Sequence, residues 1–382
     1  MPMPHIDSLF VAHAERIAAL NVTDWDSLVA SADVFMQRPY LEAMEAAAPS
    51  NVSPRYAVLY RGAKPIAAVA MQLIRFEGRT GVAKTAPLHG VAQFVEERTL
   101  VLGTLAGWGH TGVALAPDVS AAEVWPELAR VLDGLRRFEK SRGRVNVTLL
   151  KDVGSYAPDS QLRHSGYERA PAGADMRLVL GEKWPTFEAY LSSLNAKARN
   201  SVKRTLREVE AAGYVCRALS SSEVAAAEAR IDHLYGEVWA NADVRPIRLS
   251  GRFFVELKNR LGSGCEIIGL EREGRLDGFA VALKNHDSCV GYYLGFDRTV
   301  EAPMYLRLLV SMIEQGIAWR VGSLSMGRTA EEPKARLGAT PTDSWIWVKH
   351  RTPPMNWAVG SLLGSMRTVQ APTHRVFRAE ER

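Results

Sequence analysis

The chain of 382 residues has only three cysteines, and this scarcity excludes several classes of protein. Cys216, Cys265 and Cys289 lie far apart in apolar stretches, without a CxxC pair or a histidine at ligand spacing. Such a set supports neither a disulfide framework nor a structural zinc site. We therefore expect buried thiols that pack as small apolar side chains.

Long apolar runs are missing as well. No segment approaches the roughly 18 uninterrupted apolar residues that a transmembrane helix needs. The N-terminus (MPMPHIDSLF) lacks the basic stretch and apolar core of a secretory signal. Apolar residues make up 47% of the chain and charged residues 23%, as in ordinary soluble proteins. These observations predict a cytoplasmic globular protein.

Several catalytic motifs are absent too. The sequence contains no GxSxG, P-loop, HExxH or dinucleotide-binding pattern. His164 and His233 each have a glutamate four residues on, an arrangement that more often forms a surface pair than half of a metal site. We predict that the protein uses no metal ion.

Positive charge is concentrated in the second half. The net charge is +5, and residues 183–382 carry 28 Lys and Arg against 22 Asp and Glu, whereas residues 1–182 carry 19 against 20. A mildly basic half favours partners that bear phosphate, such as nucleotides, coenzyme A, RNA or anionic lipid. The basic residues are not clustered as densely as in duplex-DNA binders, so we expect no DNA partner.

The length exceeds what one hydrophobic core usually organises, so two domains are expected. Both halves show helices, then antiparallel strands, a crossing helix and further strands. This order predicts an α/β fold with a mixed sheet in each of two tandem domains, residues 1–182 and 183–351. Residues 352–382 form an aromatic and basic tail, for which docking on the protein itself is favoured over contact with a membrane surface.

Apolar periodicity gives the expected elements. In the first half it predicts strands at 55–61, 65–76, 100–116, 144–150 and 175–180 and a helix at 120–141. In the second half it predicts helices at 186–212, 222–241, 250–261 and 304–319 and strands at 214–219, 265–272, 276–284, 288–297, 321–326 and 344–350. The three strands within residues 265–297 are expected to form an antiparallel meander.

Three segments of the second half carry a resemblance to a known family. They are the helix Ala189–Arg204, the strand Gly291–Asp297 and the segment Gly327–Ala339. Their order resembles the second domain of tandem GNAT proteins, which include the Fem-type peptidyltransferases and the cellulose-biosynthesis acetyltransferase-like (CelD-like) group. The first half resembles these proteins only in its order of elements.

The resemblance implies two domains of the acyl-CoA N-acyltransferase (GNAT) fold, each with a mixed sheet splayed between its fourth and fifth strands. It also implies transfer of an acyl or aminoacyl group to an amine, from acyl-CoA or aminoacyl-tRNA. GNAT enzymes cradle the coenzyme A pyrophosphate in a glycine-rich loop after the fourth strand. Asp297–Met304 contains no glycine, Pro303 lacks an N–H, and Ala114–Asp133 of the first half has no glycine either. This departure favours an unusual donor.

A cluster of basic residues follows one predicted helix. Its members are Lys197, Arg199, Lys203, Arg204 and Arg207. Spacings of four and seven residues place much of this charge along one side of the helix. Like charges so close together repel one another, and a phosphate-rich ligand would relieve this repulsion. We therefore predict that this ridge of basic residues binds the donor phosphates. The alternative is that the ridge is an ordinary solvated helix face.

Two more basic residues follow a later strand. Arg328 and Lys334 lie on a loop and a short helix after Gly327. Arg328 is expected to face the splayed strands and clamp a carboxylate or phosphate, with Lys334 nearby in the phosphate site. The alternative is a salt bridge from Arg328 to Glu331 or another nearby carboxylate that fixes the loop.

Candidates for proton transfer cluster around the central strand. Asp297 and Glu301 lie at its exit, where the cleft is expected, and Asp297 is the predicted general base. Tyr292 and Tyr293 lie within the strand and should point to opposite faces; Tyr292 is a further candidate. The structural alternatives are that Asp297 caps the next helix or pairs with Arg298, and that the tyrosines only pack.

The sequence thus predicts an N-acyltransferase that moves an acyl or aminoacyl group from a phosphate-bearing donor, a thioester or a charged tRNA, to an amine. Two alternatives stay open. One is a non-catalytic ligand-binding protein with a degenerate GNAT fold. The other is a membrane-surface acyltransferase that acts on a lipid-linked amine.

Overall fold

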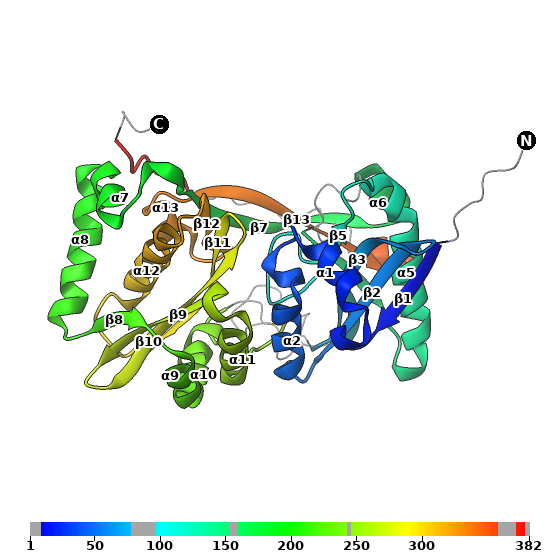
Figure 1. Ribbon diagram of the computed structural model, residues 1–382, viewed down its shortest axis with the longest axis horizontal. Coiled ribbons are helices and arrows are strands. Elements are labelled where there is room, and N and C mark those ends of the chain that lie inside the picture. Colours follow the sequence, from blue (N-terminus) through cyan, green and yellow to red (C-terminus); the bar gives the residue numbers. More distant parts are fainter. Residues whose placement is uncertain (1–8, 78–95, 153–158, 243–245, 358–371, 379–382) are drawn as a thin grey trace, which may run out of the picture. The chain divides into compact units, whose positions relative to one another are not determined.

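The computed structural model (Figure 1) describes residues 9–77, 96–152, 159–242, 246–357 and 372–378. The chain divides into two compact units. Unit 1 comprises residues 1–172, 243–249 and 345–367, and unit 2 comprises residues 173–242, 250–344 and 368–382. The division falls within strand β7 (Glu168–Val179), earlier than the expected boundary at residue 182, and β13 (Thr340–His350) also contributes to both units.

The sheet of unit 1 contains a meander followed by a parallel pair of strands. Its strands are β1 (Leu9–Ala14), β2 (Val52–Arg61), β3 (Lys64–Glu77), β4 (Glu96–Leu102), β6 (Val147–Lys151) and the end of β13, with the short β5 (Val113–Leu115) beside β3. Neighbours are antiparallel except β4 and β6, which run parallel.

Helices pack against this sheet through aromatic side chains. They are α1 (Val22–Val29), α2 (Arg38–Ala46), α5 (Ala121–Phe138) and α6 (Asp159–His164), with 3-10 turns at Ile17–Ala19, Val34–Met36 and Glu139–Arg142. Trp25 of α1 is fully buried and contacts Tyr56 of β2 edge to face, with ring centroids 5.8 Å apart.

Unit 2 repeats the same sheet order. Its strands are β8 (Val215–Ala218), β9 (Cys265–Arg272), β10 (Arg275–Asn285), β11 (Ser288–Phe296), β12 (Ser323–Ser325) and the end of β7. The antiparallel meander is confirmed, and its first turn uses Gly274 at a φ of 75°. Again one neighbouring pair, β11 and β12, is parallel.

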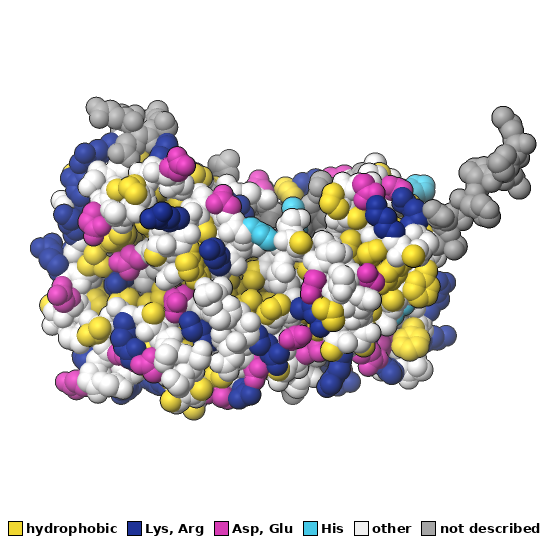
Figure 2. Space-filling view, in the orientation of Figure 1, with side chains coloured by type: hydrophobic (Ala, Val, Ile, Leu, Met, Phe, Trp, Pro, Cys, Tyr) yellow, Lys and Arg dark blue, Asp and Glu magenta, His cyan; other side chains and the backbone are white. Residues whose placement is uncertain are grey.

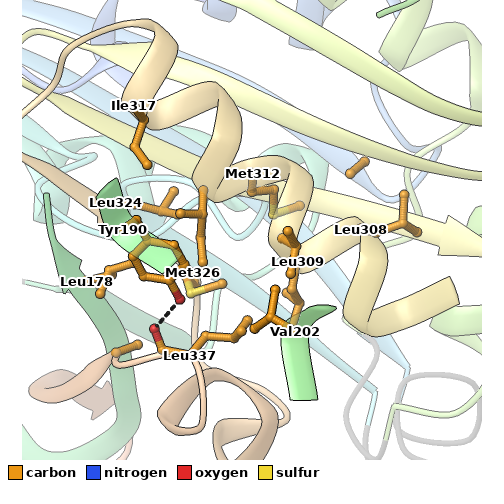
Figure 3. Close-up of a cluster of buried hydrophobic side chains, with 14 of the residues drawn as sticks. Leu178, Tyr190, Val202, Leu308, Leu309, Met312, Ile317, Leu324, Met326 and Leu337 are labelled. Atoms are coloured by element: carbon orange, nitrogen blue, oxygen red, sulfur yellow. Dashed lines mark hydrogen bonds between the residues drawn. The ribbon is translucent and has the colours of Figure 1, made fainter. Parts of the chain in front are cut away.

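The helices of unit 2 cover both faces of its sheet. They are α7 (Phe187–Ser193), α8 (Ala196–Ala211), α9 (Ser221–Ala226), α10 (Glu228–Trp239), α11 (Gly251–Leu261), α12 (Met304–Ala318) and α13 (Glu331–Ala335), with 3-10 turns at Gly181–Lys183 and Gly262–Gly264. On one face α12 and α8 bury Leu309 and Val202 against Leu324, and the Tyr190 hydroxyl donates to the Leu337 carbonyl at 2.8 Å (Figure 3).

The other face of the sheet is aromatic. Phe254 of α11 contacts Phe279 of β10 and Tyr235 of α10. Tyr292 packs against Phe253, and the Tyr293 ring lies 5.5 Å from that of Tyr235, so both tyrosines reach the α10–α11 side. The prediction that they point to opposite faces was wrong. A register shift opposite Ala280–Ala282 interrupts the alternation of side chains along β11.

Three predicted elements are shorter in the structure than the periodicity suggests. The helix predicted over 186–212 breaks at Leu194 because Asn195 caps α8, its side-chain oxygen accepting from the Ala198 N–H at 2.9 Å. The helix predicted over 222–241 is α9 and α10, which meet at Ala227. The strand predicted over 100–116 is β4, a loop and β5.

Candidate active site

In unit 2 the two parallel strands separate toward their carboxyl ends. β12 pairs only with Ser288–Val290, the first residues of β11. The rest of β11, from Gly291 to Phe296, extends past the end of β12 while it stays paired with β10. This is the splay between fourth and fifth strands that a GNAT fold implies.

A cavity of about 1320 Å³ opens at the carboxyl end of β11. Its wall is built from α8, Phe296, the start of α12, the α13 region and the C-terminal residues His374–Val376. All of these residues belong to unit 2. The volume accommodates a ligand of nucleotide size or larger.

Cations line one side of this cavity. Lys197 and Arg204 lie two helical turns apart on α8, Arg207 is one turn further, and all three are exposed members of the wall. Arg336 and Arg375 add two more cations, and Glu332 is the acidic residue of the wall. Figure 2 shows Lys and Arg side chains gathered at the end of unit 2 where α8 lies in Figure 1.

The other two members of the predicted ridge do not line the described part of the cavity. Among the described residues of the cavity wall, Arg199 and Lys203 do not occur. Arg199 instead donates to the Leu194 carbonyl at 2.9 Å, which ties α8 to the end of α7. Lys203 is exposed one helical turn before Arg207, and it is not among the described residues of the wall. The described cavity wall therefore contains three of the five basic residues of α8 that the sequence pattern predicted for the phosphate site.

The interior of the cavity is apolar. Val202, Met304 and Leu337 are buried and contribute to its wall. Phe296 and Tyr305 also line it, with ring centroids 6.0 Å apart. Burial raises the pKa of Tyr305 to about 12, so its hydroxyl stays protonated at neutral pH. An apolar, aromatic interior with a cationic rim suits a ligand that combines a base or acyl group with phosphates.

The N-terminus of α12 faces this cavity. The first hydrogen bond of its ladder joins the Arg307 N–H to the Pro303 carbonyl at 3.1 Å. The amides of Tyr305 and Leu306 precede that bond, and both residues line the wall. First-turn amides and the helix dipole favour an anion here, although the N-cap is a proline and contributes no N–H.

The carboxylate of Asp297 is part of an ion-pair network. Arg230 and Arg275 each donate to it at 2.9 Å, and the Thr299 hydroxyl donates at 2.6 Å. Hydrogen bonds from Thr299 and Arg230 hold the pKa of Asp297 well below its ordinary value. A carboxylate held in this way is a poor proton acceptor, so the geometry does not support a general-base role.

The other predicted proton-transfer groups are outside the described cavity wall. Tyr292 is buried in the aromatic layer between β11 and α11. Glu301 is exposed in the loop before α12. Neither residue, nor Asp297, is among the described residues of the cavity wall.

Lys334 and Arg328 both contact other residues of unit 2 outside the cavity wall. Lys334 is 3% exposed, and its ammonium donates to the Gly327 carbonyl at 3.1 Å and to the Thr329 carbonyl. Burial lowers the pKa of Lys334 to about 8. The aliphatic part of Arg328 lies beside Gly173 of β7. Neither Lys334 nor Arg328 is among the described residues that line the cavity.

Unit 1 has a glycine-rich loop at the position where the sequence analysis expected none. Because β4 ends at Leu102, the loop after it is residues 103–112 (GTLAGWGHTG), not Ala114–Asp133. Its amides already have acceptors within the unit. Gly109 N–H donates to Asp152 at 3.2 Å and His110 N–H donates to Asp33 at 2.7 Å. Carboxylates of the chain therefore occupy donors that an open phosphate cradle would offer to a ligand.

Two features are missing from the part of the chain that the structure describes, a metal cluster and a membrane-spanning helix. These residues contain no group of three or more His, Cys, Asp and Glu side chains arranged to hold a metal ion. None of the helices in the described ranges combines the length and apolar character that a bilayer span requires.

Comparison with known proteins gives one family and a set of similar folds. The FemAB-like family model, described as peptidoglycan biosynthesis/recognition, matches residues 177–380. No curated protein matches the sequence. FemX has a similar structure, with a TM-score of 0.56 at 10% identity over 89% of this chain and 98% of that chain.

Two other solved structures share the arrangement. A tandem GNAT protein from the clavulanic acid biosynthesis pathway gives a TM-score of 0.53 at 14% identity over 91% of this chain and 99% of that chain. The C-terminal domain of a putative lysylphosphatidylglycerol synthetase from Agrobacterium fabrum gives 0.51 at 10% identity, over 92% and 100%. At these identities the likeness establishes the fold.

The repeated sheet with its parallel pair, the cavity of unit 2 and these similarities define an acyltransferase of tandem GNAT architecture. Because the family model covers more than half of the chain, the protein belongs to the FemAB-like family.

Proposed function

We propose that the protein transfers an aminoacyl group from a charged tRNA to an amine of a peptidoglycan precursor. The observation that carries this proposal is the cavity of unit 2, where a cationic wall adjoins an apolar interior at the end of β11. The acceptor class follows from the description of the family. Charged tRNA is made in the cytoplasm, so we infer that the reaction takes place there.

The cations of α8 support a donor that carries several phosphates. Lys197, Arg204 and Arg207 are spread over three helical turns and can follow a phosphodiester chain better than a single phosphate. Arg204 lies 3.7 Å from Glu208, a weak exposed pair that a ligand phosphate can replace. A positively charged groove that tracks a nucleic-acid backbone is the usual device for binding single strands.

The aromatic pair supports an adenosine in the interior. The 3′ end of every tRNA is an adenosine that carries the aminoacyl ester. Phe296 and Tyr305 present ring surfaces on which a base can stack. Stacking there would leave the ester near the carboxyl end of β11.

Coenzyme A also contains a phosphorylated adenosine, so the two donor classes share this chemistry. The loop before α12 distinguishes them, because residues 297–303 contain no glycine and Pro303 provides no amide. The GNAT pyrophosphate cradle depends on such amides. We therefore favour the tRNA donor.

The reaction needs no net proton acceptor from the protein. The acceptor nitrogen attacks the ester carbonyl, a C–N bond forms and the bond from carbon to the ribose oxygen breaks. The proton that the amine loses balances the proton that the ribose oxygen gains. This balance is consistent with the structural role of Asp297, since a strong base is not required once the amine is neutral.

A transfer assay with two donors tests the proposal. The protein is incubated with a muramyl peptide that bears a free amine and either bulk tRNA charged with labelled amino acids or acetyl-CoA, and products are analysed by mass spectrometry. We expect a product with charged tRNA alone. Product from acetyl-CoA alone, or from neither donor, would contradict the tRNA proposal.

Matched variants connect the activity to the cavity. Arg204→Ala should lower kcat/KM for the donor by about tenfold, because charge-assisted hydrogen bonds contribute roughly 1.5–3 kcal/mol. Lys203→Ala, on the same helix but outside the wall, should change it less than about twofold.

The membrane-surface version of the reaction has one observation in its favour. Met355 is 50% exposed and Trp357 is 75% exposed at the start of the tail, and residues 358–371 fall outside the described ranges. Apolar and indole side chains of this kind can rest in a lipid headgroup layer. Liposome flotation of the wild type and Trp357→Ser separates the two versions, since only a membrane-bound enzyme should float and lose that property in the variant.

A further inference from the structure

The C-terminal segment, defined here as Pro372–Arg378, is built into unit 2. The Arg378 N–H donates to the Ser193 carbonyl at 3.0 Å, and Phe377 forms an antiparallel bridge with Leu194. Val376 is only 5% exposed. The segment thus extends the end of α7 with backbone hydrogen bonds and a buried side chain.

Asn195 joins this segment to the start of α8. Its side-chain oxygen caps α8, while its side-chain nitrogen donates to the Arg375 carbonyl at 2.7 Å. Its backbone N–H donates to the Val376 carbonyl, also at 2.7 Å. One residue therefore fixes the position of Arg375 relative to Lys197, which follows Asn195 by two positions along the chain.

Phe377 anchors the segment in an aromatic site. Its ring stacks on Trp184, with centroids 5.0 Å apart, and meets Tyr190 at an angle of 71°. Gly338 leaves the space for this ring, because a Cβ at that position would overlap Phe377. Gly338 also has a φ of 95°, so both the space and the backbone conformation favour glycine there.

These contacts place a further cation on the donor cavity. His374, Arg375 and Val376 form part of its wall, and the segment is bonded to Asn195 at the start of the helix that carries Lys197. The His374 ring contacts the Glu332 carboxylate at 3.0 Å, so the local acid of the wall is already paired with the segment. Arg375 is exposed and lines the cavity, and the backbone is held by hydrogen bonds at the carbonyls of Arg375 and Val376.

We propose that the C-terminal segment is a wall of the donor site and that Arg375, together with Lys197, binds a phosphate of the donor's terminal adenosine nucleotide. This inference rests on the function proposed above. It assigns a role in donor affinity to Arg375, which follows the α8 cap residue Asn195 by 180 positions in the sequence. A guanidinium and an ammonium on two joined elements of one cavity wall can bind a phosphate together.

Binding of two small probes tests the proposal by isothermal titration calorimetry on the full chain. One probe is the 5′-phosphorylated trinucleotide CCA, the common 3′ end of tRNA, and the other is adenosine 3′,5′-bisphosphate, the nucleotide part of coenzyme A. Arg375→Ala should weaken binding of the preferred probe by about tenfold. Arg378→Ala is the matched control, because Arg378 is an exposed arginine of the same segment outside the described cavity wall, and it should change binding less than about twofold.

The outcomes separate this inference from the proposed function. If the wild type binds CCA and Arg375→Ala binds it equally well, the role of Arg375 is overturned and the tRNA proposal stands. If only the bisphosphate binds and Arg375→Ala weakens it, Arg375 is supported and the tRNA donor is overturned. If the wild type binds neither probe, both proposals are overturned.

Asn195 is a positioning residue in this account, and a double-mutant cycle tests that role. Asn195→Asp keeps an oxygen to cap α8 but loses the amide that donates to the Arg375 carbonyl. As a single change, Asn195→Asp should weaken probe binding. In the double variant it should add little to the loss that Arg375→Ala causes, because both changes disable the same contact. Fully additive losses would show that Asn195 acts through stability and not through Arg375.

Discussion

Replacing Phe377 by alanine should release the C-terminal segment without unfolding unit 2. Loss of a fully buried Phe side chain costs roughly 3–5 kcal/mol. Phe377 is half-buried and stacks mainly on Trp184, so about 2–3 kcal/mol is expected. Because every 1.4 kcal/mol is a factor of ten, the detached population should rise roughly 30- to 150-fold.

Trypsin cleavage after Arg375 measures this population. In the native state the Arg375 carbonyl accepts from Asn195 and Val376 is buried, so cleavage requires detachment. The rate of release of residues 376–382, followed by mass spectrometry, should therefore rise with the detached population. Phe138→Ala is the control, since Phe138 is 64% exposed on α5 of unit 1. Equal cleavage rates in Phe377→Ala and the wild type would refute the reasoning.

Three further predictions concern structural residues of unit 2. Gly338→Ala crowds the Phe377 ring at a φ of 95°, so it should raise the same cleavage rate and lower the free energy of unfolding in urea by about 2 kcal/mol. Asp297→Asn should cost about 2 kcal/mol at pH 7, less than a fully buried pair because Arg275 is 63% exposed. Since its ion pairs lower the pKa of Asp297, the stability they contribute is present above the ordinary carboxyl pKa and lost in acid, and urea midpoints of wild type and variant should converge as the pH falls below about 4. Burial lowers the pKa of Lys334 to about 8, so the unfolded chain holds a proton that the folded protein releases; the wild type should gain stability relative to Lys334→Met as the pH rises from about 8 toward about 10. A difference that is constant with pH would contradict the assignment for either titrating residue.

Much of the fold could be predicted because its signals are local. The hairpin of β2 and β3 turns at Gly62, which has a φ of 59° as a tight turn requires. The strand of Cys265–Arg272 has the bounds that the apolar pattern gave. The helix breaks at Asn195 and Ala227 were missed because apolar spacing continues across them, and only the cap of Asn195 carried a signal, a residue type that favours helix starts.

The site was predictable only in part. The spacing of Lys197, Arg204 and Arg207 on one helix gave the cationic wall, since helical periodicity determines which side chains share a face. The neighbours of Asp297 could not be predicted, because Arg230 comes from a helix 67 positions away. Arg375 was missed for the same reason, since no local pattern relates the C-terminal segment to the cap of α8.

The aromatic members of the site were missed for a different reason. Phe296 and Tyr305 fit the apolar patterns of β11 and α12, and such residues usually pack in the core. Only the separation of β11 from β12 exposes their rings to a cavity. Whether a residue lies at the end of a strand beside a parallel neighbour depends on how the whole sheet is paired. The local sequence around that residue does not determine it.

The central claim is that the cavity of unit 2 binds the acyl donor, and the affinity for tRNA tests it most directly. Fluorescence anisotropy with labelled tRNA should give a Kd for the wild type, for Lys197→Ala with Arg204→Ala, and for Lys203→Ala. We predict that the double variant binds about 100-fold more weakly while Lys203→Ala stays within about threefold of the wild type. Equal losses in the two variants, or no binding by the wild type, would contradict the claim.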